Sequence, residues 1–209
     1  MFRRKFPGRS TPGFAHGLIA ATLIALALLL PTGATATVLR ALTLDALIAD
    51  ADAIVLARVE RSGARLVREG TGATPYTFTT LHVSKWLKGD GPARIVLKER
   101  GGQFGNHGLT IDGAPEYRAR EEVLVFLSRR PNDTKNFRTS GMTQGKFTVL
   151  HGAPGVPDSV SRDTSSVALV RTDTTSAGHD LVASHNEPAL ELDNVLDRIR
   201  EVLAKRGAQ

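Results

Sequence analysis

The pattern of hydrophobic and polar residues divides the chain into a leader, a β-rich region, a polar stretch and a terminal helix. The leader has a run at 18–30 that is apolar except for Thr22. The basic residues Arg3, Arg4, Lys5 and Arg9, and no acidic residue, precede it. Pro31 and Gly33 end the run, and Ala34-Thr35-Ala36 has the small-x-small pattern that a signal peptidase accepts. We therefore expect residues 1–36 to be a signal peptide, cleaved between Ala36 and Thr37.

A membrane anchor is the alternative interpretation of this leader. A spanning helix needs about 20 apolar residues, and the run at 18–30 is shorter. Contact with the membrane is therefore expected only through the uncleaved signal. The mature protein is expected to be exported to the periplasm or the extracellular medium.

Between residues 37 and 150, short apolar segments separated by Gly and Pro are typical of a mainly β domain, a small barrel or sandwich. Alternation of polar and apolar positions is clearest at 76–85. A short N-terminal helix over 43–48 is expected first, since Thr43 suits its cap and Asp45 its first turn. The expected strands are 53–59, 76–85, 93–98, 123–127 and 147–150, with 137–139 pairing nearby.

Composition changes after residue 150. Gly, Pro, Ser, Thr and Asp dominate 151–187, where only 167–170 resembles a strand, so we expect a flexible linker or long loop. Residues 188–209 are expected to form a C-terminal amphipathic helix that packs on the domain or, as the alternative, binds a partner. Its apolar residues recur at helical spacing, at Leu192, Val195, Leu196, Ile199, Val202 and Leu203.

Removal of the leader changes the charge of the protein. The whole chain carries +6, and loss of the four basic leader residues leaves +2. The remaining Lys and Arg are interspersed with Asp and Glu along the sequence, which does not favour nucleic-acid binding. The chain has no Cys, so neither a lipid anchor on cysteine nor a disulfide framework is expected.

The sequence contains no strong catalytic or metal-binding motif, and we expect no cofactor. Gly141 to Phe147 resembles a phosphate-binding loop, but it has one residue too few between its glycines and lacks a hydroxyl residue after Lys146. A tight bend before a strand fits it better. The histidines have no recognised zinc spacing. Glu121 and Glu122 are adjacent, so in a strand they point to opposite faces and cannot form a facing acid–base pair.

The most unusual segment is the glycine-rich loop from Gly101 to Gly113. Its glycines permit backbone conformations that other residues resist, and Phe104 and His107 are its chemically distinctive side chains. The loop is either a recognition surface or a wide connection between strands. Trp86, after the second strand, marks a ligand patch or closes one end of a barrel. The candidate binding residues are Trp86, Gly101, Gly102, Phe104 and His107.

Several segments together resemble a family of uncharacterised exported bacterial proteins. In chain order they are 42–47, 51–55, 76–83, 86–89, 101–102, 113–115, 121–127 and 144–147. The resemblance implies an OB-like barrel of the kind used by netrin-like and tissue-metalloproteinase-inhibitor domains, with a loose link to secreted matrixin-type metalloproteases. The inhibitors grip the protease zinc with an N-terminal cysteine, whereas this mature chain would begin at Thr37. The family also tends to place a Pro-Gly turn where this chain has Arg118-Ala119-Arg120.

The expected function is therefore that of an exported, non-enzymatic binding domain that engages a protein or cell-envelope partner through its loops. Two alternatives stay open. One is a structural envelope protein. The other is a secreted hydrolase that uses His107 or His151 together with an acid supplied by the fold.

Overall fold

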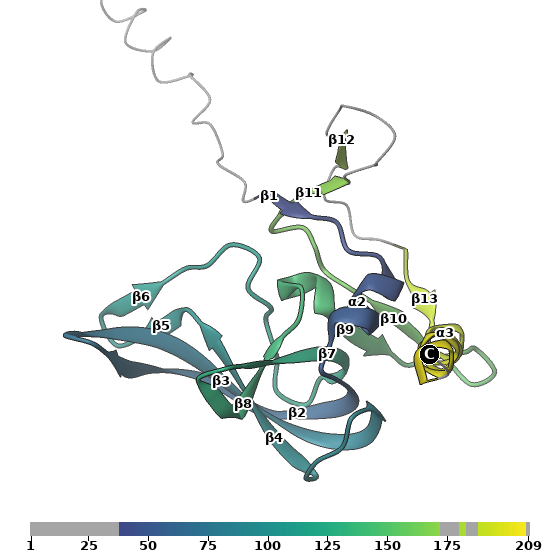
Figure 1. The fold of residues 1–209 in the computed structure, drawn as a ribbon, viewed down its shortest axis with the longest axis horizontal. Helices are drawn as coiled ribbons and strands as arrows, with labels where there is room; N and C mark the ends of the chain where they lie inside the picture. The colour runs from purple at the N-terminus through teal and green to yellow at the C-terminus, as the bar shows by residue number, and fades with distance from the viewer. Residues whose placement is uncertain (1–37, 172–179, 183–187, 208–209) are drawn as a thin grey trace, which may run out of the picture. The chain divides into compact units, whose positions relative to one another are not determined.

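The computed structural model describes residues 38–171, 180–182 and 188–207, and this part of the chain is mainly β (Figure 1). The predicted signal peptide and its cleavage site, Ala36 and Thr37, lie outside the described residues. Within the described ranges, no helix has the length and apolar character needed to span a membrane.

One large sheet is partly closed into a ring of five strands, as the sequence led us to expect for a mainly β domain. The ring consists of β2 (Ala53–Glu69), β3 (Gly72–Lys88), β4 (Arg94–Arg100), β8 (Asp133–Thr139) and β7 (Glu122–Arg130). β2, β3 and β4 form an antiparallel meander. β8 pairs with β4 in parallel, at Leu97 and Phe137, and with β7 antiparallel. β7 returns to β2 and completes the ring.

The sheet continues outward from β7 through three short strands, β9 (Lys146–Leu150), β10 (Ser159–Ser161) and β13 (Leu190–Glu191). A separate three-stranded sheet has the order β1 (Val38–Arg40), β11 (Ala168–Arg171) and β12 (Asp180–Val182). A small hairpin of β5 (Gly102–Phe104) and β6 (His107–Leu109) follows β4.

The β2–β3 hairpin is longer than the strands predicted at 53–59 and 76–85. Its last pair joins Glu69 to Gly72, so that Gly70 and Thr71 form a two-residue turn. Gly70 has φ +59°, which such turns favour and which glycine adopts at low cost. The sequence pattern missed this extension because exposed polar residues occupy both faces of the ribbon near its tip, leaving no clear alternation.

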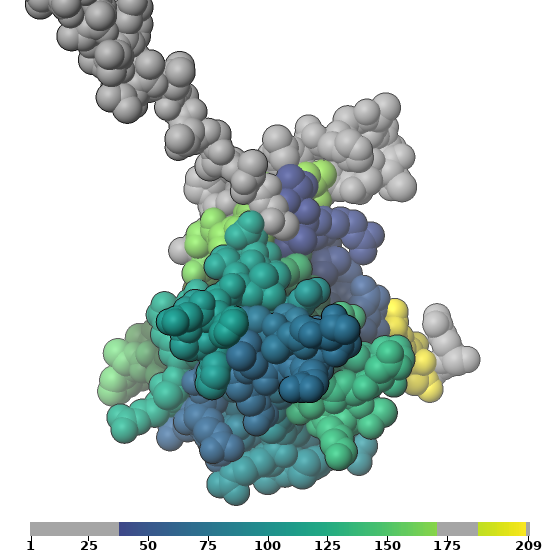
Figure 2. Space-filling view, turned by 90° about the vertical axis from the view of Figure 1, so that its left-hand side faces the viewer, coloured from purple at the N-terminus to yellow at the C-terminus, as the bar shows by residue number. Residues whose placement is uncertain are grey.

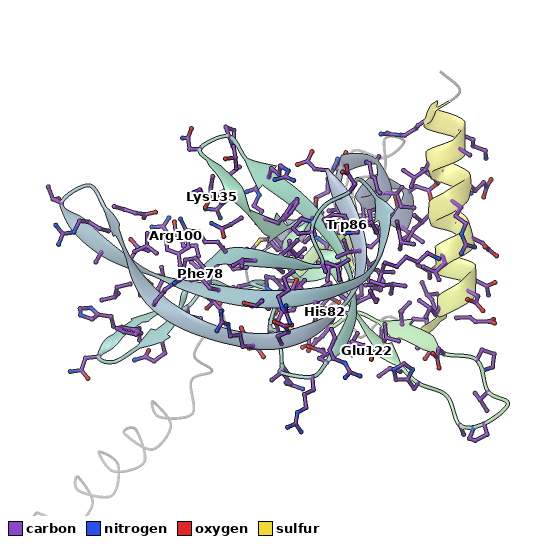
Figure 3. All side chains as sticks on the ribbon, turned by 90° about the horizontal axis from the view of Figure 1, so that it is seen from below. Phe78, His82, Trp86, Arg100, Glu122 and Lys135 are labelled. Carbon is purple, nitrogen blue, oxygen red and sulfur yellow. The ribbon has the colours of Figure 1, made fainter. Side chains whose placement is uncertain are left out.

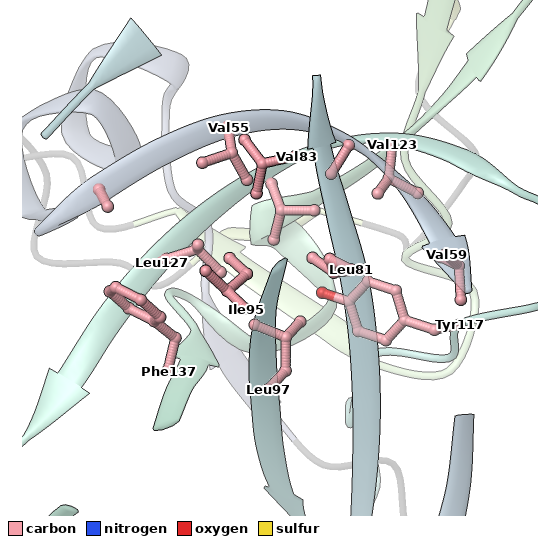
Figure 4. Packing of buried hydrophobic residues seen from close by; sticks show 13 residues of the cluster. Val55, Val59, Leu81, Val83, Ile95, Leu97, Tyr117, Val123, Leu127 and Phe137 are labelled. Atoms are coloured by element: carbon pink, nitrogen blue, oxygen red, sulfur yellow. The ribbon is translucent and has the colours of Figure 1, made fainter. Parts of the chain in front are cut away.

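The inward residues of the ring form the first core (Figure 4). Val55, Leu81, Leu97 and Val125 are each completely buried there. Tyr117, from the segment between β6 and β7, covers this core, and its hydroxyl lies 2.7 Å from Thr139 Oγ1. A buried hydroxyl with a partner avoids the free-energy cost of an unsatisfied polar group.

A second core lies between the sheet and two helices, α2 (Leu44–Asp50) and α3 (Leu192–Gly207). α2 begins after Thr43, whose side chain accepts a hydrogen bond from the Ala46 backbone N–H. α3 presents Val195 and Ile199 to Phe126 and Phe147 within this core. The C-terminal helix therefore packs on the domain. It begins at Leu192, later than the predicted 188, because Leu190 and Glu191 pair as β13.

Residues 151–171 pack on the domain, whereas their composition predicts a flexible linker or long loop. β10 is only three residues long, yet its central Val160 is buried in the second core and pairs with Val149 of β9. One buried valine flanked by serines gives too short an alternation to be recognised in a sequence. The remaining part of the predicted linker, 172–187, is described only at β12.

The glycine-rich motif from Gly141 to Phe147 forms a single turn of 3-10 helix, η1 (Met142–Gly145), that leads into β9. Its Gln144 is buried and holds the N-terminal segment in place. The Gln144 Oε1 atom accepts from the Leu42 backbone N–H at 2.8 Å, and Nε2 donates to the Arg40 carbonyl at 3.1 Å. The predicted tight bend before the strand is thus confirmed, and its Gln144 side chain anchors the N-terminal segment.

Candidate functional site

The glycine-rich loop forms a defined hairpin on the β2–β3 ribbon. Gly101 and Gly102 have φ +111° and +118°, which residues with a side chain rarely adopt. A Cβ atom at Gly102 would lie 2.5 Å from Thr77 Oγ1 and 2.8 Å from Ala64 Cβ. Thr77 Oγ1 in turn donates to the Gly101 carbonyl at 2.9 Å. Glycine is required here because the chain crosses the ribbon in direct contact with it.

The tip of this hairpin projects an aromatic side chain. Phe104 pairs with His107 across the turn, and 47% of Phe104 is exposed. Gly105, at φ +57°, makes the turn, and the Gln103 side chain donates to its carbonyl at 2.7 Å. A large exposed apolar side chain on an ordered turn is typical of a contact surface. In the space-filling view, the blue and teal chain of this region occupies the centre of the face (Figure 2).

A groove of about 430 Å³ lies beside the base of the hairpin. It runs between Gly101–Gln103 and the segment 109–118, with Glu99 and Tyr117 among its lining residues. Burial raises the pKa of Glu99, although its carboxylate accepts a hydrogen bond from the Thr139 backbone N–H. Burial also raises the pKa of Tyr117. The groove thus places a neutral hydroxyl and a partly desolvated carboxyl beside the glycine backbone at the base of the hairpin.

Trp86 does not join the hairpin residues. It lies near the end of β3, whereas the hairpin crosses β3 at Thr77 (Figure 3). Trp86 packs against the first core, with its ring centroid 6.4 Å from that of Phe137. The turn after β3 closes over it, since a Cβ atom at Gly91 would lie 2.7 Å from the indole. Of the five candidate binding residues, the structure brings together Gly101, Gly102, Phe104 and His107 and leaves Trp86 apart, partly buried against the first core.

A second polar centre surrounds His151, which the sequence did not single out as a binding residue. The His151 Nδ1 atom is 3.0 Å from Asp158 Oδ2, and Nε2 is 3.0 Å from Glu122 Oε2. Glu122 also accepts from Arg58 at 2.8 Å, and Asp158 accepts from the Gly152 backbone N–H at 3.0 Å. The centre lines a groove of about 330 Å³ that includes Ser84 and Leu192.

Both ring nitrogens of His151 face a carboxylate, and ionised carboxylates only accept hydrogen bonds. The arrangement therefore favours the doubly protonated ring. Asp158, first, and then Glu122 raise the pKa of His151. Arg58 and His151 lower the pKa of Glu122. A general base needs a free nitrogen directed at its substrate, so this centre is better suited to linking segments than to catalysis.

Glu121 and Glu122 diverge, as their adjacency in the sequence predicts. The Glu121 carboxylate accepts from Lys146 Nζ and from Thr148 Oγ1, each at 2.6 Å. Burial works against ionisation of Glu121, but the Arg118 backbone N–H together with Lys146 and Thr148 holds its pKa below the usual value. The hydrolase alternative names His151 with an acid supplied by the fold, and Asp158 and Glu122 are the acids that the structure places there. The sequence could not identify them, because the members of the centre come from three distant segments and share no spacing.

Within the ranges that the structure covers, no group of three or more His, Asp or Glu side chains is arranged to hold a metal ion. Comparison of the chain with protein-family models, with curated proteins and with solved structures finds no match. The function is therefore argued from the site itself.

Proposed function

We propose that this protein is an exported, non-enzymatic binding domain, an OB-like barrel that engages a protein or cell-envelope partner through the β5–β6 hairpin. The observation that carries the proposal is Phe104, an exposed aromatic side chain on a hairpin whose base is fixed by Gly101 and Gly102. Aromatic side chains of this kind contribute much of the free energy of binding at interfaces because they are large and lose few rotamers.

The connectivity of the ring supports an OB-like identity. The OB-fold is a five-stranded, partly open Greek-key barrel. Here the three-stranded meander β2–β3–β4 is followed by β7, which pairs with β2, and by β8, which lies between β4 and β7. Between β4 and β7 the chain inserts the β5–β6 hairpin and the segment 109–118, so the candidate contact surface is an insertion on the barrel.

The export part of the proposal is supported by the leader, with its basic start, apolar run and small-x-small pattern at Ala34-Thr35-Ala36. The proposed cleavage between Ala36 and Thr37 precedes β1 in the chain. Val38 is exposed, while Leu39 contacts the fold through its pairing with Leu169 of β11. Cleavage at this site would leave every described strand intact.

The hydrolase alternative receives less support. His151 does meet acids in a groove, but Asp158 and Glu122 occupy both of its ring nitrogens. His107 lies at the exposed tip of the hairpin, and neither ion pairs nor hydrogen bonds of its side chain occur within the part of the chain that the structure describes. The other alternative is a structural envelope protein, and the test below distinguishes it from the proposed binding domain.

The test is site-specific photo-cross-linking in the exporting cells. A photoreactive residue replaces Phe104 in one variant and Val156 in the other, since Val156 is exposed to 59% and lies in a different loop. We expect one discrete adduct with an envelope or secreted component at position 104 and none at 156. A further variant keeps the photoreactive residue at 156 and lacks residues 102–108. Its folding and export should be unchanged, which would show that the hairpin is not needed for either. Equal adducts at both positions, or none at 104, would refute the proposed contact.

A further inference from the structure

The basic residues of this protein are concentrated on the barrel, although its overall charge is nearly balanced. The strands β2, β3, β4 and β8 contain only four acidic residues: Glu60, Glu69, Glu99 and Asp133. The same strands contain many more basic residues: Arg58, Arg61, Arg65, Arg68, Lys85, Lys88, Arg94, Lys98, Arg100, Lys135 and Arg138. The sequence gives the impression of scattered charge because these residues are spread over a long stretch of chain.

Four of these cations share one face of the β2–β3–β4 sheet. Arg61 pairs with Thr80, Phe78 with Lys98, and Tyr76 with both Arg65 and Arg100. Side chains two residues apart in a strand point to the same face. Arg61, Arg65, Lys98 and Arg100 therefore surround Phe78, and we call this surface the basic face. Figure 3 shows Phe78 and Arg100 on the outstretched part of the sheet, away from α3.

Contacts within the basic face hold its cations in place. The Arg65 guanidinium lies 3.6 Å from the Phe78 ring centroid, and Lys98 Nζ lies 4.6 Å from that of Tyr76. Arg61 donates to Thr80 Oγ1 at 3.2 Å. Such contacts reduce the entropy that long side chains lose when they bind a ligand.

The positive charge of this face exceeds the negative charge near it. Among the described residues, Arg61, Arg65 and Arg100 have no carboxylate within ion-pair distance. Two acids offset part of this charge. Asp133 lies 3.5 Å from Lys98 Nζ. Glu69 accepts from the Tyr76 hydroxyl at 2.6 Å, and this bond, with the charges of Arg100 and Lys98, lowers its pKa. Exposed arginines without a partner keep their capacity for bidentate contacts with anions.

A hollow of about 350 Å³ lies between the arginines. It exists because Gly63 stands opposite Phe78, and no atom lies within 4 Å of a Cβ position at Gly63. Arg61 and Arg65 line the hollow together with Phe78 and Val96. Four residues along a strand separate the two arginines by about 13 Å, and two strand spacings separate Arg65 from Arg100 by about 10 Å. These backbone spacings spread the cations along and across the ribbon, so that a linear polymer can contact each cation in turn.

We propose that the basic face binds a linear anionic polysaccharide. Single-stranded nucleic acid requires aromatic faces on which bases can stack, but Arg65 and Lys98 cover faces of Phe78 and Tyr76. A protein interface requires an apolar centre, and all the large exposed apolar side chains of the described chain lie elsewhere: Val38, Phe104, Leu150, Val156 and Leu190. A polymer of hydrated sugars with regularly spaced charges requires neither.

The basic face is independent of the proposed hairpin contact. Ala64 and Thr77, which the hairpin covers, alternate with Gly63, Arg65 and Phe78 along the strands and so point to the opposite face of the ribbon. Failure of one proposal therefore leaves the other intact.

The experiment measures binding of the mature protein to fluorescent polygalacturonate and dextran sulfate over a range of salt concentrations. Neutral dextran, oligo-dT and polyglutamate serve as the competing ligands. We expect one or both anionic polysaccharides to bind more tightly than all three competitors, with an affinity that falls as salt rises. R65Q/R100Q should weaken the binding about tenfold or more and make its salt dependence shallower.

The matched control is R200Q/K205Q, which removes the same charge from exposed positions on α3 and should change the affinity by less than about twofold. Arg61→Gln is the second test variant, since it breaks only the contact with Thr80. Circular dichroism and thermal unfolding establish that each variant is folded. The proposal is overturned if neither polysaccharide binds, if oligo-dT or polyglutamate binds at least as tightly, or if the basic-face and α3 variants behave alike.

Discussion

Gly102 shows how one residue determines the position of the candidate contact surface. Any residue with a side chain would have to adopt a φ of +118° there. Its Cβ atom would collide with Thr77 and Ala64 of the β2–β3 ribbon. We expect Gly102→Ala to lower the free energy of unfolding by about 2–3 kcal/mol, since strain and a close contact add. Chemical denaturation monitored by tryptophan fluorescence measures the change, because Trp86, the single tryptophan of the chain, packs against the first core.

Gly63→Ala is the matched control for that prediction. Gly63 lies in the strand beneath the hairpin, at an ordinary φ and with open space at its Cβ position. Alanine there should change the free energy of unfolding by less than about 1 kcal/mol and should tend to stabilise, since it restricts the unfolded chain. If both variants lower the free energy of unfolding by the same amount, the close approach of Gly102 to the ribbon is not what holds the hairpin in place.

His151 makes stability depend on pH through a single side chain. Asp158 and Glu122 raise its folded-state pKa above the unfolded value of about 6.5, so its stabilising contribution is fully present below that pH. The contribution is lost as pH rises through the raised pKa. The pKa values of Glu122 and Asp158 are lowered, so their contribution disappears only as pH falls below the usual carboxylate range. The centre therefore stabilises most between about pH 5 and 6.5.

His151→Gln tests this dependence. Thermal unfolding measured from pH 5 to 9 should show the variant less stable than the natural protein at the acidic end and nearly equal to it at the alkaline end. Arg58 and Gly152 also contact the two carboxylates and remain in place. His107→Gln, in the exposed hairpin, is the control and should follow the natural profile. A constant difference across the whole range would show that His151 acts by packing alone.

At the scale of elements, α3 shows what periodicity can and cannot predict. Its apolar spacing predicts an amphipathic helix, but the partner of its apolar face depends on contacts with Phe126 and Phe147, which lie far away in the sequence. Ile199 is completely buried at this contact. Ile199→Ala should lower the free energy of unfolding by about 2–5 kcal/mol, because it leaves a cavity between helix and sheet.

The control on the same helix is Arg200→Ala. Arg200 is exposed to 57% and pairs only with Asp197 one turn away, so its loss should cost less than about 0.5 kcal/mol. Urea unfolding followed at Trp86, which lies in the other core, reports whether α3 belongs to the same cooperative unit. If Ile199→Ala leaves the Trp86 transition unchanged, the helix unfolds separately from the barrel.

The strands that sequence reasoning located best are those with a buried face. Leu81 and Val83 alternate with polar residues, and β3 follows that pattern through the core. β10 has only Val160 to signal its burial, and the hairpin beyond Glu60 has polar residues on both sides. The glycine loop could be identified from its composition. The hydrolase alternative names His151, but its partners Asp158 and Glu122 could not be identified. Its contacts depend on how β2, β7 and the chain after β9 meet in three dimensions.

At the scale of the whole molecule, charge and contact surface are separated. The barrel strands carry the basic face on one side of the ribbon and the hairpin on the other, whereas α3 has three acidic and four basic residues and is nearly balanced. A protein with this distribution can meet an anionic polymer and a second partner without competition between them. An uneven charge distribution also orients the molecule during diffusion toward a charged surface, and this effect weakens with salt.

Both proposed contacts require that the protein reach the cell envelope or the medium, and the leader makes this testable. Ala34 and Ala36 are the two small residues that the signal peptidase requires at the proposed cleavage site. Thr35 lies between them, at the position of the small-x-small pattern where the residue type is not restricted. We expect the exported protein to begin at Thr37, as read by mass spectrometry of its first peptide. Ala36→Arg should block cleavage and keep the longer form with the membrane fraction, whereas Thr35→Gln should be processed normally. Recovery of the uncleaved natural chain from the cytosol would contradict export and leave both contacts without a place to occur.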